Sequence, residues 1–247
     1  LDFIQYAKQN SLYDTGVTVG AEDSILTLIR KEKFIGSFYD KKEINTLFDI
    51  IQGHPLEVAI KLAAFYGLRR EEIIGLKWTA IDFENNTLTI QHTVTECNLD
   101  GKHIEVASDT AKTDSSLRTM PLVTNFREML LAKKEKQEHY RKLCGRSYCK
   151  EYLDYIFVNE MGERWKPRYL SDGFKRILEQ NGLRRIRFHD LRHTCASLLL
   201  ANNVPMKKIQ EWLGHSDFST TANIYAHLDF QSKISSAEAM LTGLGMG

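Results

Sequence analysis

Long apolar runs are absent from this sequence of 247 residues, since no stretch approaches the roughly 20 apolar residues that a membrane-spanning helix needs. The first ten residues, LDFIQYAKQN, also lack the apolar core of a secretory signal peptide. We therefore expect a cytoplasmic protein without a membrane partner. The chain does not begin with Met, which suggests a fragment of a longer protein.

Cysteine is scarce and irregularly spaced. Cys97, Cys144, Cys149 and Cys195 do not have the spacing of a disulfide framework, which favours a reducing compartment. His139 precedes two of them in an H-x4-C-x4-C arrangement, but a zinc site needs a fourth ligand and usually closer spacing. No Asp/Glu cluster suggests a magnesium site. The sequence therefore predicts no metal and no cofactor.

An excess of charge is missing too, because the formal net charge is only +1. The composition, 43% hydrophobic and 26% charged, is that of an ordinary globular protein. Net charge by itself gives no reason to expect a nucleic-acid partner. Any basic surface must arise from an uneven distribution of charge over the fold.

Helical patterns occupy most of the chain. Asp40 followed by Glu43 is a capping box that opens a helix over 41–52. Pro55 begins a second helix, which Gly67 ends. Further helices are predicted over 70–78, 124–151, 169–182, 189–203, 205–214 and 219–228.

Residues 80–122 change to the alternating pattern of strands. The segment 80–96 alternates around a turn, a second turn and strand follow at 98–107, and 117–122 is a short strand. A hairpin is predicted around Met161–Gly162. The fold class is therefore α+β, mostly helical, with a small antiparallel sheet.

The stretch RFHDLRHT, residues 187–194, crowds histidine and arginine into the start of a helix. On that helix His189, Arg192 and His193 share one side, while another side is an apolar stripe of Leu191, Cys195, Leu198 and Leu199. A helix N-terminus attracts anions, and an arginine fork with an imidazole suits phosphate oxygens. The alternative is a solvated helix start in which the cations pair with Asp190.

Four more residues stand at positions open to chemistry, and three of them also have an ordinary interpretation. Arg69 follows the Gly67 helix stop and precedes a helix with Glu72 in its first turn, but it could be a surface arginine. Lys112 lies in a polar turn between strands, where lysines are usually solvated. His215 follows the Gly214 helix end. Tyr225 lies on a short helix, where tyrosines usually pack with a wet hydroxyl.

The order and type of these residues resemble those of the tyrosine recombinases, also called the phage integrase family. The resemblance covers about residues 34–230 and looks closest to integrases of temperate phages and conjugative transposons. It rests on the combination of GLRREE (67–72), AKTDSSLRTMPL (111–122), FHDLRHTCAS (188–197), LGHS (213–216) and TTANIYAHL (220–228).

The resemblance implies site-specific DNA strand exchange, with integration and excision of a mobile element as its use. Arg69 and Arg192 would clamp the scissile phosphate. Tyr225 would attack the phosphorus and form a covalent 3′-phosphotyrosine intermediate. Lys112 would protonate the departing 5′-oxygen.

The remaining roles follow from the same resemblance. His215 would hydrogen-bond the phosphate, His189 would take part in proton transfer with the tyrosine, and Glu72 would position Arg69. Ahead of the helix that starts at His189 lie three further arginines that are candidates for contacts with the DNA backbone: Arg184, Arg185 and Arg187.

The partners implied are double-stranded DNA with attachment sites, a homotetramer on that DNA, and accessory DNA-bending or excision factors. We interpret residues 1–33 as a linker or a remnant of an upstream core-binding domain, and 34–230 as the catalytic domain. The C-terminal tail, 231–247, would dock on a neighbouring subunit or on its own domain. Alternatives are DNA relaxation of the type IB topoisomerase kind and a catalytically silent DNA-binding protein.

Overall fold

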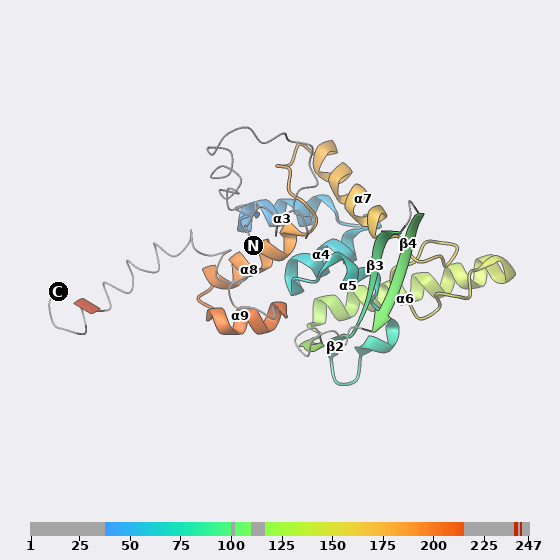
Figure 1. The fold of residues 1–247 in the computed structure, drawn as a ribbon, viewed down its shortest axis with the longest axis horizontal. Coiled ribbons are helices and arrows are strands. Elements are labelled where there is room, and N and C mark those ends of the chain that lie inside the picture. Colours follow the sequence, from blue (N-terminus) through green and yellow to red (C-terminus); the bar gives the residue numbers. More distant parts are fainter. Residues whose placement is uncertain (1–37, 100–101, 110–116, 215–239, 242, 244–247) are drawn as a thin grey trace, which may run out of the picture. The chain divides into compact units, whose positions relative to one another are not determined.

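The computed structural model describes residues 38–99, 102–109, 117–214, 240–241 and 243 (Figure 1). Along these residues the α-helices are α3 (Lys41–Ile50), α4 (Glu57–Tyr66), α5 (Arg70–Ile74), α6 (Thr124–Cys144), α7 (Pro167–Gln180), α8 (Asp190–Ala201) and α9 (Met206–Leu213). The 3-10 helices are η1 (Trp78–Ala80) and η2 (Gly145–Ser147). The strands are β1 (Ile81–Asp82), β2 (Thr87–Ile90), β3 (His92–Leu99), β4 (Lys102–Asp109) and β5 (Arg118–Pro121). The predicted α+β class, mostly helical, is confirmed.

The helix ends follow the chemistry of the local sequence. The Asp40 carboxylate accepts a hydrogen bond from the Glu43 backbone, and the Glu43 carboxylate accepts one from the Asp40 backbone. This reciprocal pair is the predicted capping box of α3. Gly67 after α4 and Gly214 after α9 have φ of 65° and 66°, the left-handed geometry in which glycine ends helices.

Two predicted helices are shorter in the structure. The helix expected over 70–78 ends at Ile74. A Cβ on Gly75 would lie 2.6 Å from the His92 carbonyl oxygen, so the chain there packs against the backbone of β3 and leaves the helix. The long helix expected over 124–151 ends at Cys144, because Gly145 takes φ of 52° and turns the chain.

The strands form two sheets in the described residues, where the sequence predicted one. β1, β2 and β5 form an antiparallel sheet in that order, with Leu88 opposite Met120. β3 and β4 pair only with each other. The reason lies at Gln91, since Ile90 pairs with Arg118 while His92 pairs with Asp109, so the chain changes partners at this residue.

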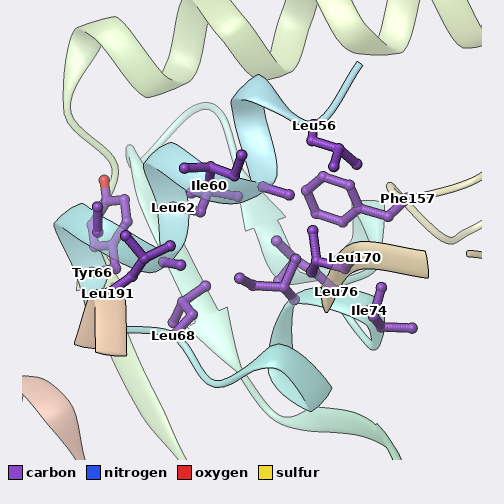
Figure 2. Close-up of a cluster of buried hydrophobic side chains, with 14 of the residues drawn as sticks. Leu56, Ile60, Leu62, Tyr66, Leu68, Ile74, Leu76, Phe157, Leu170 and Leu191 are labelled. Carbon is purple, nitrogen blue, oxygen red and sulfur yellow. The ribbon is translucent and has the colours of Figure 1, made fainter. Parts of the chain in front are cut away.

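The hydrophobic core lies between α4 and the elements around it. Figure 2 shows Phe157 and Leu170 on one side of this cluster and Tyr66 beside Leu191 of α8 on the other, with Ile60 and Leu62 of α4 between them. A second cluster joins α8 to α9 through Cys195, Ala196, Ile209 and Leu213. The apolar stripe predicted behind the RFHDLRHT stretch thus packs inward. In the described part of the chain, no helix has both the length and the apolar character needed to cross a membrane.

The predicted hairpin around Met161–Gly162 is also present. Val158 and Arg164 form an antiparallel bridge across it. Gly162 has φ of 81°, which places it in the left-handed region that a tight turn requires.

Candidate active site

Arg69 stands at the N-cap of α5. Its backbone N–H and its guanidinium Nη1 donate to the two oxygens of the Glu72 carboxylate, each at 2.8 Å. Glu72 is buried, whereas the Arg69 side chain is 34% exposed. The structure therefore brings these two residues into contact and leaves the Arg69 side chain partly exposed.

Glu72 has a second arginine partner, Arg118 at the start of β5. Arg118 Nη1 and Nη2 donate to the two carboxylate oxygens at 3.0 and 2.8 Å, a bidentate pair. Burial by itself would raise the pKa of Glu72, but the hydrogen bonds and charge of Arg118, with the charge of Arg69, lower that pKa to about 2. Glu72 is therefore ionised at neutral pH.

Arg192 lies in α8 and is only 2% exposed. Its Nη1 donates to the Gly67 carbonyl oxygen and its Nη2 to the Leu213 carbonyl oxygen, both at 2.6 Å. Burial and the nearby Arg69 lower the pKa of Arg192 to about 9, so the guanidinium remains charged at pH 7. Two helix C-terminal regions, those of α4 and α9, thus converge on this one side chain.

Arg69 and Arg192 both bind backbone carbonyl groups at the C-terminal end of α9. Arg69 Nη2 donates to the Gly214 carbonyl oxygen at 3.3 Å, next along the chain from the Leu213 carbonyl that Arg192 contacts. Gly67 permits this convergence, since a Cβ at Gly67 would lie 2.3 Å from Leu213 Cδ2. Figure 1 shows α8 and α9 side by side. The fold therefore gathers two cations where α9 ends.

The charge of this cluster is positive. Arg69, Arg118 and Arg192 surround a single carboxylate, that of Glu72, and each of the three lowers its pKa. Three cations against one anion leave an electropositive cluster that includes the partly exposed Arg69 side chain. Such a site suits a phosphate group, whose oxygens accept hydrogen bonds from arginine.

His189 occupies the N-cap of α8, one helical turn before Arg192. His189 is exposed to solvent by its accessible area. Desolvation by the surrounding protein and the charge of Arg192 nevertheless lower its pKa below the usual 6.5. The ring is therefore neutral at pH 7 and can accept a proton.

His193 packs behind His189. The ring centroids are 5.2 Å apart in an edge-to-face arrangement. Burial and the nearby His189 lower the pKa of His193 to about 4, and its Nε2 lies 4.0 Å from the buried Asp190 carboxylate. His193 thus packs against the His189 ring.

The three arginines predicted to contact the DNA backbone have different surroundings. Arg184 donates to both carboxylate oxygens of Glu43 at 2.8 Å, and Arg187 donates to the Asp190 carboxylate. Arg185 is exposed. All three are exposed and precede α8 in the chain, and their contact with DNA stays a prediction.

Three residues of the predicted constellation, Lys112, His215 and Tyr225, lie outside the described residues. The chain nevertheless connects two of them to the cluster, because Gly214 directly precedes His215 and Arg118 follows Lys112 by six residues. Arg118 was not among the predicted site residues. The R-x-x-P-L pattern of 118–122 was the signal that could have named it.

Within the described residues, this site has no metal-binding cluster and does not line either of two sizeable cavities. The described residues contain no group of three or more His, Cys, Asp and Glu side chains that could hold a metal ion. A cavity of about 610 Å³ lies between α6 and the 156–169 segment, and one of about 420 Å³ lies beside His92 and Asp109. Neither cavity is lined by Arg69, Glu72, His189 or Arg192. Glu72 and Arg192 are buried, and the Arg69 side chain is partly exposed.

Comparisons with known proteins agree with this picture. The model of the phage integrase family matches residues 37–232, well over half of the chain. A tyrosine recombinase XerC-like protein of Caldanaerobacter subterraneus is 33% identical over 214 residues, which are 85% of this chain and 54% of that protein. The integrase of Staphylococcus phage L54a is 26% identical, over 69% of this chain and 47% of that integrase. The chain thus spans about half the length of these relatives.

A solved structure adds the fold. The Tn1549 transposon integrase, in complex with a circular intermediate DNA, aligns with a TM-score of 0.68 and 20% identity, over 83% of this chain and 66% of that one. At this identity the likeness establishes the fold.

Proposed function

Because this chain belongs to the phage integrase family, we propose that it carries out site-specific DNA recombination through a covalent tyrosine intermediate. The observation that carries the proposal is the convergence of Arg69 and Arg192 on consecutive carbonyl groups at the end of α9, directly before His215. Two guanidinium groups held this way form a phosphate clamp next to a residue of the family's LGH motif.

Strand cleavage in this proposal is a transfer of the phosphoryl group from the 5′-oxygen to the tyrosine. The Tyr225 oxygen attacks the phosphorus and forms a P–O bond while the P–O5′ bond breaks. The Tyr225 proton passes to His189, whose neutral ring can accept it. Lys112 gives a proton to the departing 5′-oxygen, and the products are a 3′-phosphotyrosine and a free 5′-hydroxyl.

The arginines stabilise the charge that develops during this transfer. A phosphodiester carries one negative charge, and attack by a phenolate adds a second at the transition state. Arg69 and Arg192 supply positive charge and N–H donors at that point, and His215 adds a hydrogen bond. Because these groups suffice for charge stabilisation, the proposed reaction uses no metal and no other cofactor.

Rejoining reverses the same steps. A 5′-hydroxyl of another strand attacks the phosphotyrosine, releases Tyr225 and reseals the backbone without ATP. Integration and excision of a mobile element is the use we propose, because relatives of the chain include a phage integrase and its structural neighbours include a transposon integrase. The compartment would be the cytoplasm, where such DNA is found.

The partners follow from this chemistry. Two duplexes must meet for exchange, which favours a tetramer on double-stranded DNA, with the tail of residues 231–247 docking on a neighbouring subunit or on its own domain. Arg184, Arg185 and Arg187 would contact backbone phosphates beside the clamp. DNA-bending or excision factors would set the direction of the reaction.

The experiment that tests the function is capture of DNA from a pool of nicked duplexes with randomised sequence around the nick. The chain is incubated with the pool in EDTA, and DNA that stays bound after denaturation is sequenced. One recurring sequence supports a site-specific recombinase. Capture of many unrelated sequences would indicate DNA relaxation of the topoisomerase kind, and DNA binding without capture would indicate a silent DNA-binding chain.

A further inference from the structure

We propose that Arg118 is a positioning residue for DNA cleavage, which fixes the Glu72 carboxylate and thereby directs Arg69 toward the scissile phosphate. The inference rests on the proposed function and assigns it a residue outside the constellation considered above. It concerns a chain of three side chains that runs from the interior to the surface: Arg118, Glu72 and Arg69.

Exposure rises along this chain from Arg118 and Glu72 to Arg69. The Arg118 side chain is 7% exposed and that of Glu72 is 3% exposed, whereas that of Arg69 is 34% exposed. Both Nη atoms of Arg118 are directed at Glu72. Arg118 therefore acts on a substrate only through Glu72 and Arg69.

Glu72 receives four hydrogen bonds, two on each oxygen. Oε1 accepts from Arg69 Nη1 at 2.8 Å and from Arg118 Nη1 at 3.0 Å. Oε2 accepts from the Arg69 backbone N–H and from Arg118 Nη2, both at 2.8 Å. The Arg118 fork fixes the plane of the carboxylate, and the remaining acceptor direction of Oε1 then fixes Arg69 Nη1.

This arrangement also limits the number of Arg69 N–H donors that the Glu72 carboxylate can engage. An arginine guanidinium has five N–H donors, and within the described residues that of Arg69 uses one group toward Glu72 and one toward Gly214. Without Arg118, the buried carboxylate would gain from a second bond to Arg69. The Arg69 fork would then turn inward, away from the phosphate.

A purely structural buried ion pair predicts something different. Such a pair would stabilise the fold, and its loss would impair every activity by the same factor whatever residue stands at position 69. A residue that acts through Arg69 loses its effect once Arg69 is altered.

The test is a double-mutant cycle on the full chain with the nicked duplex found by the capture experiment. Adduct formation is timed for the wild type, Arg118→Lys, Arg69→Lys and the double variant, over incubations long enough to accumulate trapped product in the slow variants. Lysine keeps the charge at 118 but cannot form the bidentate fork. Thermal unfolding and DNA affinity are measured for each.

We expect Arg118→Lys to slow cleavage by about tenfold to a hundredfold, as small displacements of a reacting group do. In the Arg69→Lys background the same substitution should change the rate by less than about twofold, because the guanidinium that Arg118 positions is then absent. Arg164→Lys is the matched control. Arg164 is also 7% exposed and pairs with a carboxylate, Glu105, and this variant should cleave like the wild type.

Equal losses from Arg118→Lys in both backgrounds, or wild-type cleavage by Arg118→Lys, would overturn the positioning role. A wild-type chain that forms no adduct would overturn the proposed function itself. This outcome is distinguishable from failure of the positioning role, because it is seen in the wild type before any variant is compared. If Arg118→Lys does not fold, Arg118→Gln replaces it, since the glutamine amide can still donate to Glu72 but lacks the guanidinium fork. The same two rate comparisons then decide.

Discussion

Glu72 and Arg118, 46 residues apart in the chain, form a buried bidentate ion pair with N–O distances of 3.0 and 2.8 Å. The pair ties the first helical turn after Arg69 to strand β5, which follows the segment that contains Lys112. The Glu72–Arg118 ion pair therefore connects two parts of the proposed active site. Removing either partner leaves the other charge buried without its main counterion.

Stability should depend on the charge of Glu72. Because the folded-state pKa is lowered from 4.5 to about 2, ionised Glu72 stabilises the fold above pH 4.5, and this contribution is lost as the pH falls toward 2. We expect Glu72→Gln to lower the free energy of unfolding by about 3 kcal/mol at pH 7, and by less at pH 3. Urea unfolding at several pH values measures this difference.

Glu71→Gln is the control for that series, since Glu71 pairs only with the neighbouring Arg70 among the described residues. It should change stability by less than about 1 kcal/mol at either pH. A Glu72→Gln deficit that is the same at pH 3 as at pH 7 would contradict the assigned ion pair.

Arg192→Lys should impair cleavage far more than DNA binding. Lysine keeps one charge but cannot reach both the Gly67 and the Leu213 carbonyl oxygens with a planar fork. Loss of one donor that stabilises developing charge typically slows catalysis by about 10²–10³-fold. Arg70→Lys, which alters a half-buried arginine of α5 that pairs with Glu71, should leave the rate unchanged. Adduct formation within about threefold of wild type for Arg192→Lys would remove this side chain from the clamp.

Gly67→Ala should weaken both the fold and the site. Gly67 has φ of 65°, and an added Cβ would lie 2.3 Å from Leu213 Cδ2, at the end of α9 where both arginines bind. We expect a loss of about 1–3 kcal/mol of stability together with slower cleavage. Gly145→Ala is the matched control, because Gly145 has φ of 52° but no atom within 4 Å of an added Cβ. It should lose stability from backbone strain alone and keep its cleavage rate; equal cleavage by both variants would contradict the role of this contact.

The pH dependence of cleavage should reflect a neutral His189. Because burial and the charge of Arg192 lower the pKa of His189 from 6.5, most of the imidazole should be unprotonated at pH 6.5, and the rate should fall only at lower pH. His189→Gln should slow the reaction and remove this acidic limb, while His139→Gln on the exposed face of α6 should not. A pH–rate profile whose acidic limb lies above pH 6.5, or is unchanged in His189→Gln, would argue against this proton acceptor.

Local chemistry made much of the fold predictable. Asp40 with Glu43 predicted the start of α3, and Gly67 and Gly214 predicted the ends of α4 and α9, because capping depends on neighbouring residues. The division into two sheets was not predictable in this way. It depends on the change of partner at Gln91 and on the approach of Gly75 to His92, both set by tertiary packing.

In the candidate site, too, local motifs were predictable from the sequence and long-range contacts were not. Arg69, Glu72, His189 and Arg192 could be named from their motifs, and the structure brings Arg69, Glu72 and Arg192 together with the end of α9. The role of Arg118 could not be read from spacing, since Glu72 is 46 residues away. Nor could the sequence indicate that Arg184 pairs with Glu43, 141 residues distant. Contacts of this range depend on the folded topology.

The most direct test of the central claim is to locate the DNA on the protein after cleavage. The adduct formed with a nicked duplex in EDTA is digested with nuclease and protease, and mass spectrometry identifies the peptide that carries the nucleotide remnant. Of the ten tyrosines in the chain, Tyr225 should carry a 3′-linked phosphonucleotide, and Tyr225→Phe should yield no adduct. A remnant on any other residue, or an adduct that persists in Tyr225→Phe, would contradict the account.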